Sequence, residues 1–175
     1  MADPRPQRFR LWPWRQQPSV ISTRTTPPAV QEVTEKLTEL VHFERGVGAL
    51  YYYLPDESLT AIAQDLCHSR QAAHILEGGV DRDIRAQMAA LKTWTAVSAI
   101  WHSAVWQPDE ILATFGFRLI EALRAETELW RVVVDPRAQF FGLAVSTDDT
   151  QRYWLVLVIG QKGLEVGDSS ATGAR

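Results

Sequence analysis

The sequence predicts an α/β/α sandwich, in which a central, mainly antiparallel sheet lies between two helical layers. Two stretches near the C-terminus, QFFGLAVS (139–146) and RYWLVLVIG (152–160), are dense in β-branched and aromatic residues, and the turn-forming TDDT between them predicts an antiparallel hairpin. The second stretch is apolar on both of its faces, which are formed by Tyr153, Leu155, Leu157 and Ile159 and by Trp154, Val156 and Val158. A sheet with one face in water would alternate apolar and polar residues, so helices are expected to cover both faces.

A chain of 175 residues suits one domain with a substantial core. Residues 1–30 contain six prolines and are interpreted as a flexible tail with arginine and tryptophan, residues 31–162 as the domain, and residues 163–175 as a disordered C-terminal tail. Arginines alternate with Phe9, Trp12 and Trp14, which is one pattern of contact with a membrane surface. Because Pro13 interrupts any continuous amphipathic helix, a solvated tail is the favoured interpretation.

Four helices are predicted. Apolar residues three and four apart predict a helix from Pro28 to Arg45, which Gly46 and Gly48 end. Asp56 is placed to cap a second helix that begins with ESLTAIAQDL, and residues 82–91 are expected to form a short one. The stretch QPDEILATFGFRLIEALRAETEL (107–129) predicts a further helix, with Pro108 in its first turn.

Two more stretches carry the composition of strands. TWTAVSAIWHSAVW (93–106) is rich in valine, isoleucine and tryptophan and is expected to be extended. LWRVVVD (129–135) contains three consecutive valines and is also predicted to be a strand. The last third of the chain is therefore expected to be β-structure throughout.

Composition excludes several classes of function. The net charge of −3 gives no general attraction to nucleic acid, and the single cysteine excludes an internal disulfide or a multi-cysteine zinc site. No apolar run approaches the roughly 20 residues of a transmembrane helix, and the first residues lack the apolar core of a signal peptide. No phosphate-binding loop, dinucleotide-binding turn or hydrolase motif is present, so no cofactor and no metal are predicted.

Cys67 and His68 are adjacent in the second predicted helix. Neighbouring helical side chains diverge by about 100°, so the two do not form a Cys–His catalytic pair, and Cys67 is interpreted as a small buried residue. His68 lies opposite the main apolar face, which is formed by Leu59, Ile62, Ala63, Leu66 and Ala73. A histidine bonded to a backbone carbonyl or to water is the favoured interpretation, and a polar group lining a shallow cleft is the alternative.

Several motifs occur in an order known from one family. They are the helix end at His42–Arg45, the glycine turn at 46–50, the helix residues His68 and Ser69, the opening WQPDEIL, and the hairpin FGLAVSTDDTQRYWLVLVIG. This order resembles the CAP superfamily (cysteine-rich secretory, antigen 5 and pathogenesis-related 1 proteins), in particular its bacterial SCP-like members, over residues 33–160. The resemblance implies an extracellular or cell-envelope location, although this sequence carries no recognisable signal peptide.

The family's cavity has two histidines and two acidic residues, and this sequence departs from that set. His68 matches the first histidine, whereas Ala99 and Ile100 stand where the Glu and Asn of the family's GEN motif are expected. Glu126 and Thr127 stand near the place of the second histidine. One imidazole is too few ligands for zinc, so the resemblance implies a degenerate cavity without a metal. In a shifted alignment His102 or Glu126 returns to the cavity.

The function expected from this resemblance is that of a non-enzymatic CAP-like binding or interaction domain. Its partner is an unknown protein or a small apolar ligand. Two alternatives remain open: a hydrolase with a rearranged cavity around His68, and a sensory domain of the PAS or GAF kind. The sensory domains usually keep helices on one face of the sheet, contrary to the pattern of residues 152–160.

Overall fold

The computed structural model describes residues 26–85, 91 and 93–162. Four helices and five strands lie in this part of the chain: α1 Val30–Val47, β1 Leu54–Pro55, α2 Glu57–Ala72, β2 Gly79–Asp81, β3 Trp94–Val105, α3 Leu112–Ala125, α4 Thr127–Val133, β4 Phe140–Thr147 and β5 Arg152–Lys162. Most of the two predicted tails, residues 1–25 and 163–175, lies outside the described residues. So do residues 86–90 of the short helix predicted over 82–91, and residues 82–85 are not helical.

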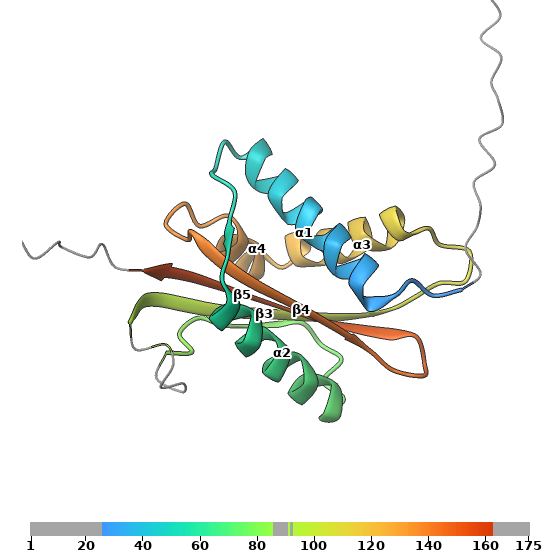
Figure 1. The fold of residues 1–175 in the computed structure, drawn as a ribbon. Helices are drawn as coiled ribbons and strands as arrows, with labels where there is room; N and C mark the ends of the chain where they lie inside the picture. Colours follow the sequence, from blue (N-terminus) through green and yellow to red (C-terminus); the bar gives the residue numbers. More distant parts are fainter. Residues whose placement is uncertain (1–25, 86–90, 92, 163–175) are drawn as a thin grey trace, which may run out of the picture.

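The five strands form one sheet in the order β1-β4-β5-β3-β2. β1 runs parallel to β4, and the other neighbours are antiparallel. Helices α1, α3 and α4 lie on one face of the sheet and α2 on the other, which gives three layers (Figure 1). The predicted α/β/α sandwich with a mainly antiparallel sheet is confirmed, and the short edge strands β1 and β2 are additions to it.

Strand β5 contributes to two separate cores. Tyr153, Leu155, Leu157 and Ile159 pack with residues of α1, α3 and α4, whereas Trp154, Val156 and Val158 pack with residues of α2. The two-faced apolar pattern of this strand therefore predicted correctly that both faces of the sheet are covered.

Helix α2 lies directly against β4. A Cβ atom added at Gly142 would stand 2.2 Å from the backbone carbon of Leu59 and the backbone nitrogen of Thr60, so only glycine allows this approach. The Asp56 carboxylate caps the helix by accepting from the backbone N–H of Ser58 at 3.0 Å and of Leu59 at 3.2 Å. The cap and the contact at Gly142 together fix the start of α2 on the sheet.

Arg45, in the last turn of α1, is 1% exposed. Its guanidinium group donates to four backbone carbonyls, those of Tyr51 at 2.8 Å, Val133 at 3.0 Å, Asp135 at 3.2 Å and Ala138 at 3.0 Å. It also lies 3.8 Å from the centre of the Tyr53 ring. The buried charge is thus satisfied by carbonyl dipoles, and α1 is joined to two loops and to the end of α4.

Two predicted elements differ from the structure. LWRVVVD was expected to be a strand, but Leu129 to Val133 belong to α4, because Leu129 and Val133 are one helical turn apart and both bury in the core with α1 and α3. The helix predicted from residue 107 starts only at Leu112, and Pro108 lies in a turn before it. That turn is closed by the buried carboxylate of Glu110, which accepts from the backbone N–H of Gln107 at 3.3 Å.

The β1 edge of the sheet is short. Leu54 donates its N–H to the Gln139 carbonyl at 2.8 Å and Asp56 donates to Phe141 at 2.9 Å, while Pro55 between them has no N–H. At the other end of β4, the side-chain amide of Gln71 donates to the Thr147 carbonyl at 2.9 Å. The edge of β4 is thus contacted at its start by β1 and at its end by the Gln71 side chain of α2.

Replacing Gly142 with alanine forces a Cβ atom into the backbone of α2. We expect Gly142→Ala to lower the free energy of unfolding by about 2 kcal/mol or more. Gly48→Ala is the matched control, because the nearest atom to its added Cβ lies 3.5 Å away. Urea unfolding followed by circular dichroism measures both, and equal stability of the two variants would contradict the described contact.

Replacing Arg45 with methionine removes the guanidinium donor from four carbonyls. The Val133 carbonyl keeps the Tyr53 hydroxyl and the Asp135 carbonyl keeps the Ala138 N–H, while the carbonyls of Tyr51 and Ala138 lose the donor described for them. We expect the free energy of unfolding to fall by about 3 kcal/mol or more, because each buried acceptor left unpaired costs about 1–3 kcal/mol. Arg131→Met on α4 is the control, since Arg131 is exposed and, within the described residues, pairs only with Glu128. An Arg45→Met loss no larger than that of the control, measured by urea unfolding, would contradict the role assigned to Arg45.

Candidate functional site

An open depression of about 510 Å³ lies on the face of the sheet that carries α3 and α4. One wall comes from the chain before β2, the floor from β3, and the other wall from the junction of α3 and α4. Its lining residues are Leu76, Glu77, Gly78, His102, Ala122, Ala125 and Glu126.

The wall before β2 is held by hydrogen bonds to the sheet. Ser103 donates its hydroxyl to the Leu76 carbonyl at 2.8 Å, and the Trp154 indole donates to the Ile75 carbonyl at 3.0 Å. Gly78 lies flat on His102, since an added Cβ atom would stand 2.8 Å from His102 Nδ1. The glycine therefore brings the backbone into contact with the imidazole and covers one of its nitrogens.

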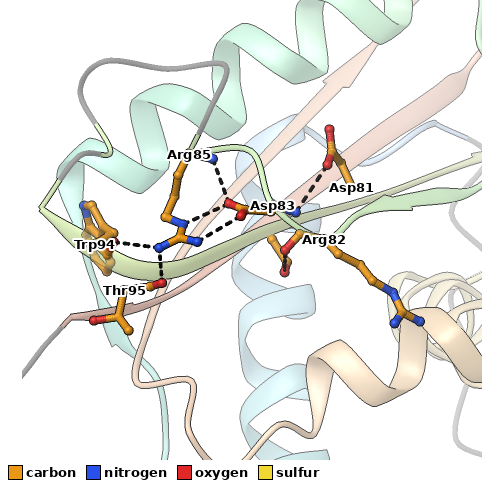
Figure 2. A network of polar contacts seen from close by, with 7 residues as sticks. Asp81, Arg82, Asp83, Arg85, Trp94 and Thr95 are labelled. Atoms are coloured by element: carbon orange, nitrogen blue, oxygen red, sulfur yellow. Dashed lines mark hydrogen bonds and ion pairs between the residues drawn. The ribbon is translucent and has the colours of Figure 1, made fainter.

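The chain after β2 is tied to the start of β3 (Figure 2). Arg85 donates to both carboxylate oxygens of Asp83 at 2.9 Å, and also to the Trp94 carbonyl at 3.3 Å and to the Thr95 carbonyl. Arg82, the next residue after β2, forms an ion pair with Glu128 of α4. These contacts fix β2 and its flanking chain between β3 and α4, and so stabilise the wall of the depression.

His102 is half-buried in the floor of the depression. Burial lowers the pKa of its imidazole, the positive charge of Arg118 lowers this pKa further, and the Glu126 carboxylate raises it. Arg118 itself is held by Glu110, to which it donates at 3.0 and 2.8 Å. His102 is therefore neutral at neutral pH, with its covered Nδ1 unpartnered.

The structure brings together two of the three cavity residues that the sequence suggested. His102 and Glu126 line the same depression, whereas His68 is exposed on α2, across the sheet. Cys67 is buried, with its Sγ 3.2 Å from Ser146 Oγ and 3.3 Å from the Trp154 carbonyl, and burial raises the pKa of its thiol. Cys67 is thus buried against the sheet while the adjacent His68 is exposed.

The described part of the chain has neither a cluster of metal ligands nor a membrane-spanning helix. Across residues 26–85, 91 and 93–162, no group of three or more His, Cys, Asp or Glu side chains is placed to hold a metal ion. In the same residues, no helix has the length and the apolar composition to span a bilayer.

A second surface, the aromatic surface, was missed by the sequence analysis. It consists of five large apolar side chains, each more than half exposed, from the end of α1, the segment leading to β1 and the first residue of β1: Phe43, Val47, Tyr51, Tyr52 and Leu54. Residues 46–55, GVGALYYYLP, contain no charged side chain and three consecutive tyrosines. The sequence motifs place residues 46–50 in a glycine turn and give the tyrosines no role, although an uncharged run of tyrosines outside any helix pattern was the available signal.

Two residues of α1, His42 and Arg45, hold the ring of Tyr52 and the backbone of Tyr51. The Tyr52 ring stacks on His42, with ring centres 5.3 Å apart, and His42 meets the edge of Phe141 at 5.4 Å. Arg45 holds the Tyr51 carbonyl, and the buried Tyr53 donates its hydroxyl to the Val133 carbonyl at 2.7 Å. Burial and the neighbouring Arg45 lower the pKa of His42, so a neutral ring supports Tyr52 at neutral pH.

Replacing Glu126 with glutamine removes the negative charge that favours protonation of His102. We expect Glu126→Gln to lower the pKa of His102 further, and NMR titration of the imidazole resonances measures it. Asp65→Asn on α2, across the sheet, is the control and is expected to leave this pKa unchanged. An unchanged His102 pKa in Glu126→Gln would contradict the proximity of the two groups.

The likeness to known proteins concerns the fold. No family model matches the sequence, and no curated protein matches it. The structure is similar to an outer surface protein from Borrelia burgdorferi, with a TM-score of 0.62 and 10% sequence identity over 79% of this chain and 99% of that one.

Two further similar structures belong to proteins that are named for a cysteine-rich secretory, or SCP, domain. A cysteine-rich secretory protein from Staphylococcus aureus has a TM-score of 0.56 and 14% identity over 78% of this chain and 41% of that one. An extracellular protein containing an SCP domain, from Bacillus anthracis, has a TM-score of 0.51 and 12% identity over 75% and 41%. This chain thus spans about two fifths of the length of these two proteins. The resemblance read from the sequence is confirmed at the level of the fold, which is that of a CAP, or SCP-like, domain.

Proposed function

We propose that this protein is a non-enzymatic, CAP-like binding domain that contacts a protein partner through its aromatic surface. The observation that carries the proposal is the exposure of that surface, with Tyr51 92% and Val47 70% exposed. Exposed apolar patches on soluble domains mark interaction sites, and aromatic residues are enriched at protein interfaces. A cell-envelope location, implied by the resemblance, belongs to the same proposal.

The exposure of these side chains favours a protein partner over a small apolar ligand. Small ligands are largely enclosed by the pockets that bind them. Five side chains that are each more than half exposed instead form an open surface, which suits contact with the surface of another protein. The stacking of Tyr52 on His42 also lowers the entropy that is lost when a partner binds, because this ring is already in place.

The charges at the rim indicate the kind of partner. Glu57 follows the uncharged stretch 46–55, whereas Glu39, one helical turn before Phe43, is balanced by its ion pair with Lys36 at 2.8 Å. Acidic residues repel the anionic surface of a membrane, while they attract the basic rim of a protein. The proposed partner therefore presents an apolar patch bordered by lysine or arginine.

Site-specific crosslinking tests this proposal. A photoreactive phenylalanine analogue is placed at Tyr51 or, as the control, at Phe117, an exposed aromatic residue of α3. In cells that naturally produce the protein, we expect one protein adduct from position 51 and none of the same mass from position 117. The purified partner is expected to bind Phe43→Ser and Tyr51→Ser at least tenfold more weakly than the unchanged chain.

Three results would contradict the proposal. They are the absence of a protein adduct at position 51, the same adducts at both positions, and adducts with lipid instead of protein. Thermal unfolding of the two serine variants checks that they remain folded, as is expected for substitutions of exposed side chains.

A further inference from the structure

Helix α1 carries an exposed row of side chains that leads to the aromatic surface. Every fourth residue along the helix is exposed: Gln31, Glu35, Glu39, Phe43 and Val47. Residues four apart are neighbours on a helix, so these side chains form a continuous row. Its first three members are polar, and its last two, Phe43 and Val47, belong to the aromatic surface. The row thus joins the point where the chain enters α1 to that surface.

Negative charge remains along this path. Glu35 accepts a hydrogen bond from the neutral side-chain amide of Gln31 at 2.9 Å, which leaves the charge of the carboxylate in place. Glu57, exposed in the first turn of α2, has no ion pair within the described residues. Ion pairs balance three other carboxylates of residues 30–57, those of Glu39, Glu44 and Asp56. A segment that suits this path is therefore basic as well as apolar.

Residues 1–25, which lie outside the described residues, have the complementary composition. They contain five arginines against one acidic residue, Asp3. Four of these arginines lie in the stretch RPQRFRLWPWR (5–15), among Phe9, Trp12 and Trp14. Arginine and aromatic residues are the types most enriched at protein interfaces. This stretch has the chemistry that was inferred for the partner of the aromatic surface, an apolar patch bordered by basic residues.

The stretch is also within reach of the aromatic surface. The Tyr153 hydroxyl holds the Pro28 carbonyl at 2.6 Å, which fixes the chain just before α1. With 18 residues α1 is about 27 Å long. The chain between Trp14 and residue 26 spans up to about 40 Å when extended, so both tryptophans can reach the far end of the helix. Val20 is too close to residue 26 to do so, because the chain between them spans only about 20 Å.

We propose that residues 5–15 dock on the aromatic surface of their own chain and compete there with the protein partner. Attachment to the same chain gives the stretch an effective concentration of roughly 1 mM. A contact with a Kd of about 0.1 mM then keeps the surface mostly occupied, and a competing partner binds about tenfold more weakly. The docking is measured without a partner, while the competition rests on the proposed function.

Paramagnetic broadening in the purified full chain tests the docking. A nitroxide is attached at Gln16→Cys, next to the stretch, because the native Cys67 is buried. We expect the label to broaden the amide resonances of Phe43 and Tyr52 more strongly than that of Phe117, an exposed aromatic residue of α3. A mixture of isotope-labelled chains without nitroxide and nitroxide-carrying chains without isotope is expected to show no such broadening. Broadening in the mixture would assign the docked stretch to a second copy and overturn the proposal.

Two double variants in the first 25 residues separate docking from mere proximity. Trp12→Ser combined with Trp14→Ser is expected to remove the selective broadening. Val20→Ser combined with Ile21→Ser is the matched control and is expected to keep it, since both residues lie outside the stretch. Equal broadening of Phe117, or the same broadening in both double variants, would overturn the docking.

The competition is measured with the partner captured by crosslinking at Tyr51. We expect the partner to bind the double tryptophan variant about tenfold more tightly than the unchanged chain, and the Val20 and Ile21 variant equally well. Selective broadening without this gain in affinity would overturn the competition. Loss of the broadening with a partner adduct still present contradicts the docking alone, and selective broadening without any partner adduct contradicts the proposed function alone.

Discussion

The arrangement of the helical layer formed by α1, α3 and α4 depends on the buried guanidinium group of Arg45. Burying a charge is unfavourable unless polar partners replace its hydration, and here four carbonyls from three segments do so. Only the planar, multiply donating group of arginine reaches all of them at once, which the single ammonium of lysine does not. The end of α1, the chain before β1, the end of α4 and the loop before β4 are thereby placed relative to one another.

Much of the fold was predictable because its signals are local in the sequence. The apolar stripe of α1, the Asp56 cap of α2 and the two apolar faces of β5 can each be recognised within a few consecutive residues. The segment 129–135 was wrongly predicted because three valines favour a strand, while its place in the fold depends on Leu129 and Val133 packing beside α3. Intrinsic preference is weaker than such tertiary contacts.

The candidate sites were less predictable, since they depend on distant parts of the chain. His102 and Glu126 were singled out in the sequence, but that they share one depression follows from the packing of the α3–α4 junction beside β3. Tyr51, Tyr52 and Tyr53 are identical in type, yet only Tyr53 is buried. Tyr53 points inward because its ring contacts Arg45 and Phe141. These contacts join distant parts of the chain, so they cannot be predicted from the composition of the tyrosine run.

The short strand β1 has a consequence for the colloidal behaviour of the protein. An unpaired sheet edge is a template on which further copies of a chain stack into fibrils. Here β1 pairs with only the first two residues of β4, and Pro55 offers no N–H to an incoming strand. The Gln71 amide occupies the Thr147 carbonyl at the far end of the same edge. These two short contacts thus make the edge of β4 a poor template for fibril growth, although no full-length strand covers it.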